Sequence, residues 1–109
     1  MERTFIMTPG FERTWSAMGL DDTDLQQLET FLLSYPDAGD VIPGLSGARK
    51  LRISLEGRGK SGGGRVIYVD VVVKQRIYLL LAYPKNLRAD MTPEQKHTIK
   101  AIIDAIKRE

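Results

Sequence analysis

Two apolar segments joined by a short polar connection constrain the fold of this chain more than any other feature. Val66–Val73 and Ile77–Tyr83 are apolar and rich in β-branched and aromatic residues, as strands covered on both faces are. The connection at Lys74 and Gln75 is too short for a crossover, so the two strands are expected to be antiparallel neighbours. We therefore predict that they form the centre of a sheet.

Weaker patterns on both sides of this central pair predict further strands and helices. Ala48–Leu55 alternates between apolar and polar side chains, as a half-buried strand does, and residues 3–8 (RTFIMT) predict a short first strand. Two helices are expected, at residues 11–18 and between Asp21 and Pro36. The intervening residues 37–44 (DAGDVIPG) are rich in turn formers and predict a connection.

A third helix has the clearest start signal. Thr92 and Gln95 form a capping box around Pro93. Four isoleucines then repeat at helical spacing: Ile99, Ile102, Ile103 and Ile106. His97 lies off this apolar stripe and is expected to face solvent, whereas Trp15 is expected to lie in the core. The predicted order is β-α-α-β-β-β-α, an α+β fold with an antiparallel sheet, in one domain formed by residues 1–109.

Charge is distributed unevenly along the chain. Residues 1–44 hold two basic and eight acidic side chains, and residues 45–109 hold fourteen basic and six acidic ones. Around the Gly-rich segment Glu56–Gly64, six basic residues are opposed by one acid: Arg49, Lys50, Arg52, Arg58, Lys60 and Arg65. A hairpin with this excess of positive charge is typical of a surface that binds a polyanion. The alternative is that these charges are solvated and protect sheet edges from aggregation.

Composition excludes several other classes of protein. The chain has no cysteine, which excludes disulfides and fits a cytoplasmic location. With His97 as the single histidine, neither a structural zinc site nor another cofactor is expected. There is no run of eighteen apolar residues and no pattern of a secretory signal, so no membrane association is expected.

Three segments of the sequence carry a resemblance to a known family. PDAGDVIPGLSGARKLRI, GRGKSGGGRVIY, and YLLLAYPKN with DMTPEQ behind it resemble the HigB-like branch of the RelE/ParE toxin superfamily. The resemblance implies a compact RelE-like fold, in which two N-terminal helices and a C-terminal helix pack on an antiparallel sheet.

The same resemblance implies the toxin of a type II toxin–antitoxin system. Such a toxin is a metal-independent, ribosome-dependent endoribonuclease that cleaves translated mRNA in the cytoplasm and arrests growth. Its expected partners are the ribosome, mRNA and a cognate antitoxin, often a helix-turn-helix protein, through which alone it reaches DNA. Two alternatives stay open: a ParE-like inhibitor of DNA gyrase, and a catalytically degenerate homologue that only binds RNA or the ribosome.

Site residues follow from the resemblance position by position. The family's basic loop residues fall on Arg58 and Lys60, its arginine after the glycines on Arg65, and its aromatic and basic pair on Tyr83 and Lys85. The predicted catalytic residues are Arg65, Lys60, Tyr83 and Lys85, and the predicted RNA contacts are Arg49, Lys50, Arg52, Arg58 and Tyr68. The sequence departs from the family at Leu87, where many relatives have glutamate, and at Pro84, which is usually not proline.

Elementary chemistry limits what such residues can do. RNA cleavage needs a base for the 2′-hydroxyl, positive charge around the phosphorane and an acid for the leaving oxygen. Lysine and tyrosine have pKa values of about 10, so they are weak bases at neutral pH. We therefore expect a modest catalyst that depends on the ribosome to orient its substrate. For Arg65 the alternative is a structural ion pair with Asp70 or Glu56.

Overall fold

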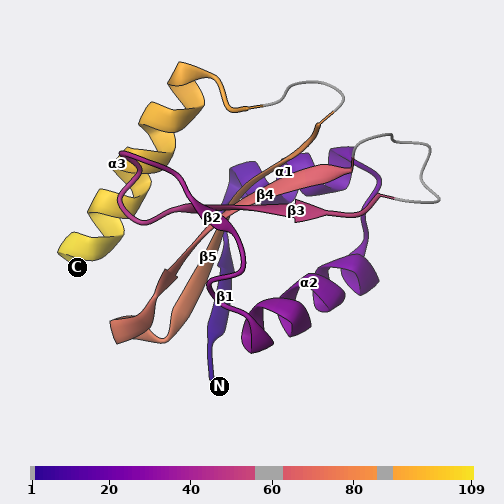
Figure 1. Ribbon diagram of the computed structural model, residues 1–109, viewed down its shortest axis with the longest axis horizontal. Coiled ribbons are helices and arrows are strands. Elements are labelled where there is room, and N and C mark those ends of the chain that lie inside the picture. Colours follow the sequence, from indigo (N-terminus) through magenta and orange to yellow (C-terminus); the bar gives the residue numbers. More distant parts are fainter. Residues whose placement is uncertain (1, 56–62, 86–89) are drawn as a thin grey trace.

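The computed structural model of the protein describes residues 2–55, 63–85 and 90–109 (Figure 1). Within these ranges five strands form one sheet in the order β1-β5-β4-β3-β2. The strands are β1 (Thr4–Met7), β2 (Asp40–Val41), β3 (Arg49–Ile53), β4 (Gly64–Val71) and β5 (Arg76–Pro84). The helices are α1 (Pro9–Ala17), α2 (Asp22–Ser34) and α3 (Pro93–Arg108), with one 3-10 turn at Val72–Lys74. The α+β prediction is confirmed.

The predicted central pair is confirmed, with one change at its turn. β4 and β5 are antiparallel neighbours in the middle of the sheet, and nearly all their side chains are buried. However, β4 ends at Val71, because the chain enters the 3-10 turn and Gln75 takes the left-handed conformation (φ +54°). Val72 and Val73 are consequently exposed, at 62% and 92% of their surface.

Two features at the sheet edges differ from the prediction. β1 pairs in parallel with β5, so the sheet is mixed rather than wholly antiparallel; an apolar pattern predicts a strand but carries no information about its direction. β2 was predicted to be part of a connection. It has two exposed residues, paired with Lys50 and Arg49, and a strand this short has no periodicity to detect.

Helices cover both faces of the sheet (Figure 1). On one face, α1 and α2 contribute Phe11, Trp15 and Leu32 to a core that also contains Val66 of β4. On the other face, α3 packs its buried isoleucines, Ile99, Ile103 and Ile106, against side chains of β4 and β5. The capping box at Thr92, the core position of Trp15 and the exposure of His97 are as predicted. No helix in the described ranges is long and apolar enough to cross a membrane.

A β-bulge in β5 changes which face its last residues occupy. Ile67 pairs with Leu81 while its neighbour Tyr68 pairs with Leu79, so Leu80 is an extra residue. Leu80 and Leu81 therefore both contribute to the core under α3. After this point the alternation is inverted, and Tyr83 lies on the α3 face rather than on the α1 face.

β1 pairs with the first half of β5 only, and α1 covers the edge of the second half. Thr8 ends β1 as the N-cap of α1: its hydroxyl accepts from the Phe11 N–H (3.1 Å) and donates to the Leu80 carbonyl (2.9 Å). Six residues later, the Thr14 hydroxyl accepts from the Ala82 N–H (3.3 Å). Two threonine hydroxyls thus replace the missing strand neighbour of β5.

Replacing Thr14 with valine tests this edge contact. The isosteric change leaves the buried Ala82 N–H without its acceptor, so we expect the free energy of unfolding to fall by about 1–3 kcal/mol. Thr23→Val is the matched control, because Thr23 is an exposed residue of α2 and should change stability by less than about 0.5 kcal/mol. Equal losses in chemical denaturation of the two variants would contradict a specific role for Thr14.

Candidate nucleic-acid interface

Three predicted site residues lie in one row across the sheet. In the register of the strands, Arg52 of β3 pairs with Arg65 of β4, and Arg65 pairs with Tyr83 of β5. Directly opposed residues point to the same face, with Cβ atoms about 4.5–5.5 Å apart. This face is the one that α3 partly covers, since Tyr83 belongs to the α3-side core. We call Arg52, Arg65 and Tyr83 the cross-strand row.

Arg65 is the most constrained member of the row. Only 6% of its surface is exposed, and its NH1 donates to the Gly64 carbonyl (2.9 Å). A guanidinium has five N–H groups, and among residues 2–55, 63–85 and 90–109 no carboxylate lies within ion-pair distance of it. A buried cation whose other donors have no partner in the described part of the chain is suited to hold an anion.

The alternative partner of Arg65, Asp70, is engaged elsewhere. Its carboxylate forms a two-pronged ion pair with Arg3, with Nε–Oδ1 at 2.7 Å and NH2–Oδ2 at 3.1 Å. Both side chains are largely buried, so this pair joins the start of β1 to β4. The hypothesis of an Arg65–Asp70 pair is therefore wrong, and Glu56 lies outside the described residues.

Lysines extend the positive surface beyond the row. Lys50 is two residues before Arg52 on β3, and its Nζ lies 3.9 Å from Oδ1 of Asp90. Asp90 also forms an ion pair with Lys96 at the start of α3, with Oδ2 and Nζ 2.9 Å apart. The pKa of Asp90 is lowered, mainly by the hydrogen bond from Lys96. The hydrogen bond from the Met91 N–H and the positive charge of Lys50 act in the same direction. The sequence did not single out Asp90 or Lys96, because their role depends on how α3 packs beside β3.

Lys85 lies at the same end of the sheet as the cross-strand row. Its backbone N–H donates to the Gly63 carbonyl (3.0 Å), which continues the β4–β5 ladder past Pro84. The Lys85 side chain is exposed. The predicted loop residues Arg58 and Lys60, like the departure at Leu87, lie outside the described residues.

Two predicted RNA contacts lie on the opposite face. Arg49 points toward the α2 side, where its NH1 donates to the carbonyls of Asp37 (3.1 Å) and Gly39 (2.7 Å). Tyr68 is fully buried in the α1/α2 core; its hydroxyl donates to Pro36 and accepts from the Gly39 N–H. A side chain buried so completely offers no surface for a base, so the structure contradicts an RNA contact for Tyr68. Alternation along the strands separates both residues from Lys50 and Arg52.

The burial of Tyr68 predicts a pH dependence of stability. Desolvation raises the pKa of its hydroxyl above the ordinary value, despite the Gly39 hydrogen bond. The pKa of Tyr68 is therefore higher in the folded than in the unfolded protein. The contribution of the neutral Tyr68 hydroxyl to stability is complete below the unfolded pKa of about 10, and it is lost as pH rises through the folded pKa. In urea denaturation, wild type should lose stability above pH 10 more steeply than Tyr68→Phe, with exposed Tyr35→Phe as the control. Parallel profiles would contradict this role.

The arrangement suits binding and polarising a phosphodiester. Arg52, Arg65 and Tyr83 point to one face from three neighbouring strands, and Lys50 and Lys85 lie nearby. Arg52 is exposed, whereas Arg65 and Tyr83 each keep only 6% of their surface exposed. Arginine donors match the oxygens of a phosphate, and strands hold them more rigidly than loops do. The geometry thus provides charge stabilisation more readily than acid–base catalysis.

Comparisons with known proteins agree with the fold. No protein-family model matches the sequence. A doubly substituted E. coli toxin RelE in the free state superposes with a TM-score of 0.53 at 18% identity, over 82% of this chain and 90% of that one. For a chain of the intact E. coli RelBE toxin–antitoxin complex the TM-score is 0.54 at 17% identity, over 77% and 96%. The isolated E. coli RelE toxin superposes with a TM-score of 0.50 at 18% sequence identity, over 94% of this chain and 99% of that one. The protein therefore has a RelE-like fold.

Proposed function

We propose that this protein is the toxin of a type II toxin–antitoxin system, of the HigB-like branch, and that it cleaves mRNA on the ribosome. The observation that carries the proposal is the cross-strand row, which gathers two arginines and a tyrosine on one face of a RelE-like sheet. The sequence motifs that resemble the family converge on the same residues. The proposal requires neither a metal nor a cofactor.

In this proposal the residues divide the work of cleavage. Arg65 stabilises the charge that develops on the phosphorane, and the Tyr83 hydroxyl contacts the reacting phosphate or transfers a proton. Lys60 and Lys85 add positive charge around the scissile bond, while Lys50, Arg52 and Arg58 hold the RNA backbone. Since none of these side chains is a good base at neutral pH, the ribosome supplies much of the orientation of the 2′-hydroxyl.

The partners follow from the same proposal. A toxin of this kind must be held inactive by a cognate antitoxin, and the E. coli RelE relative is known in complex with its antitoxin. For this chain we propose a helix-turn-helix antitoxin, which would also provide its only contact with DNA.

Expression without an antitoxin tests the proposal. Growth should stop, and primer extension should find cuts in a reporter message only when that message is translated. A reporter whose start codon is removed is the matched control and should stay intact. Intact messages in arrested cells would overturn the nuclease; inhibited gyrase supercoiling in the same extract would instead indicate the ParE-like activity.

A further inference from the structure

The outer edge of β3 is only partly covered. β2 pairs with Lys50 and Arg49, and the residues that precede it, at the Arg52 end of this edge, belong to no strand. The Ala48 carbonyl accepts from Ile42 on the β2 side. Because backbone groups of alternate residues point to the same side of a strand, the N–H and C=O of Lys50 and Arg52 also point outward. Among the described residues, no backbone hydrogen bond reaches Arg52 on this side.

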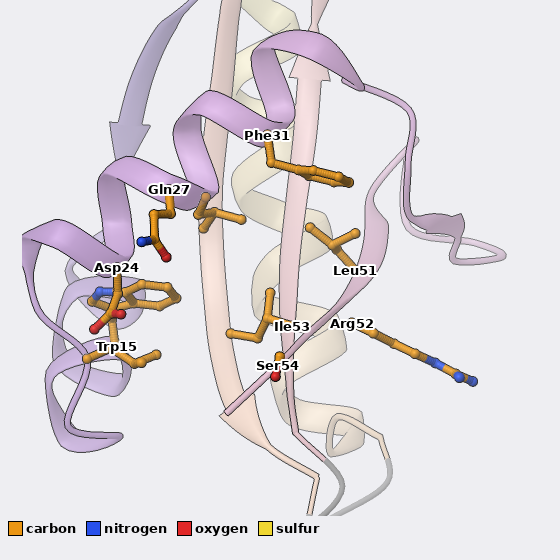
Figure 2. Close-up of a pocket in the computed structure, with 10 residues that line it drawn as sticks. Trp15, Asp24, Gln27, Phe31, Leu51, Arg52, Ile53 and Ser54 are labelled. Carbon is orange, nitrogen blue, oxygen red and sulfur yellow. The ribbon is translucent and has the colours of Figure 1, made fainter. Parts of the chain in front are cut away.

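A groove of about 260 Å³ borders this open edge, between β3 and α2. Figure 2 shows Phe31 and Gln27 of α2 on one wall and Leu51 and Ile53 of β3 on the other. The Arg52 side chain points away from the groove, so it is the Arg52 backbone that borders it. Phe31 keeps 43% of its surface exposed. The groove therefore offers an apolar wall beside unpaired backbone groups.

The two faces of β3 differ in charge, and this sets the chemistry of an occupant. On the groove side an added strand would meet apolar Leu51 and Ile53, whereas on the opposite side it would meet Lys50 and Arg52. The chain's own β2 already shows the corresponding pattern, because Asp40 is paired directly with Lys50. An acid opposite Arg52 continues that pattern by one repeat.

We propose that the open edge of β3 binds an extended segment of a partner protein, in which apolar residues alternate with acidic ones. The segment adds as a strand in line with β2, bonds to the Arg52 N–H and C=O, and places its apolar side chains in the groove beside Phe31. This inference goes beyond the proposed function and does not depend on it, since it rests on the edge and the groove alone.

Titration of the full chain with a defined peptide tests the inference. The probe is acetylated Glu-Val-Glu-Ile-Glu-Val-Glu at up to millimolar concentrations, followed by NMR of backbone amides. The Arg52 amide should shift and exchange more slowly with solvent, while the Lys50 amide, already paired with β2, should change little. N-methylation of the peptide amides on the pairing edge should weaken binding by at least about tenfold, because it removes backbone hydrogen bonds.

A matched pair of variants locates the groove. Phe31 and Tyr35 pack against each other with tilted rings (5.2 Å between centroids), so Phe31→Ala and Tyr35→Ala remove the same contact, but only Phe31 lines the groove. We expect Phe31→Ala to weaken peptide binding by roughly tenfold and Tyr35→Ala to leave it nearly unchanged.

Several outcomes would overturn the inference. These are the absence of any change at Arg52 with millimolar peptide, equal effects of the two variants, or equal binding of the peptide with lysine in place of every glutamate. Protection of the Arg52 amide that rises with protein concentration alone would assign the edge to a second copy of this chain instead.

Discussion

Replacing Arg65 with alanine is expected to lower the single-turnover rate of mRNA cleavage on the ribosome by roughly 10²–10³-fold, as removal of one donor to a developing oxyanion does. Arg65 is 6% exposed and held in β4, the central strand of the sheet, so its guanidinium needs little reorganisation when charge develops on the phosphorane. Affinity for the ribosome is spread over many contacts and should change much less.

Arg52→Ala is the matched control for this prediction, because Arg52 is an arginine in the same row but is exposed. It should weaken binding and reduce its salt dependence with a smaller effect on the cleavage step. Tyr83→Phe keeps the ring and its packing, so a lower rate with unchanged binding would assign a role to the hydroxyl. If Arg65→Ala instead lowers the melting temperature while the folded fraction cleaves at a normal rate, Arg65 is structural.

Replacing Gly63 with alanine is expected to destabilise the protein by on the order of 3 kcal/mol, through strain and a steric clash. Gly63 has a φ of +67°, and a Cβ at this position would overlap the Ile53 carbonyl oxygen of the neighbouring strand. Since Gly63 also accepts the hydrogen bond from Lys85, relief of the clash would displace the end of β5.

Gly44→Ala separates the two contributions. Gly44 has a similar φ of +77°, but nothing lies within 4 Å of where its Cβ would be. This variant should therefore lose only the free energy needed to hold an alanine in the left-handed backbone conformation, about 1 kcal/mol. Chemical denaturation of both variants measures the difference, and equal losses would show that the contact with Ile53 relaxes at little cost.

The elements that the sequence predicts well are those whose evidence is local. Runs of apolar residues predict β4 and β5, and the capping box with its isoleucine repeat predicts α3. β2 and the parallel direction of β1 were not predicted, because both depend on which strand lies beside them in space. Pairing of this kind leaves no periodic trace in the chain.

For the candidate site, alternation along β3 correctly separates Lys50 and Arg52 from Leu51. The same rule applied to Arg49 places it with Leu51, away from Lys50 and Arg52. Tyr68 lies on another strand, and its face follows only from the register in which it pairs with Arg49. That Tyr83 lies beside Arg65 could not be predicted, since it requires the register of β5 and the position of its extra residue.

The extra residue at Leu80 decides which residues of the second half of β5 enter each of the two cores. Before Leu80, odd-numbered side chains such as Ile77 and Leu79 enter the α1/α2 core; after it, odd-numbered Leu81 and Tyr83 lie under α3. Loss of Leu80 would restore a regular ladder and leave Ala82 and Tyr83 opposite the same residues of β4, on the faces they occupy now. An alignment with a relative that lacks this extra residue therefore needs a gap here, because without the gap residues of the α1/α2 core would be matched to residues that lie under α3.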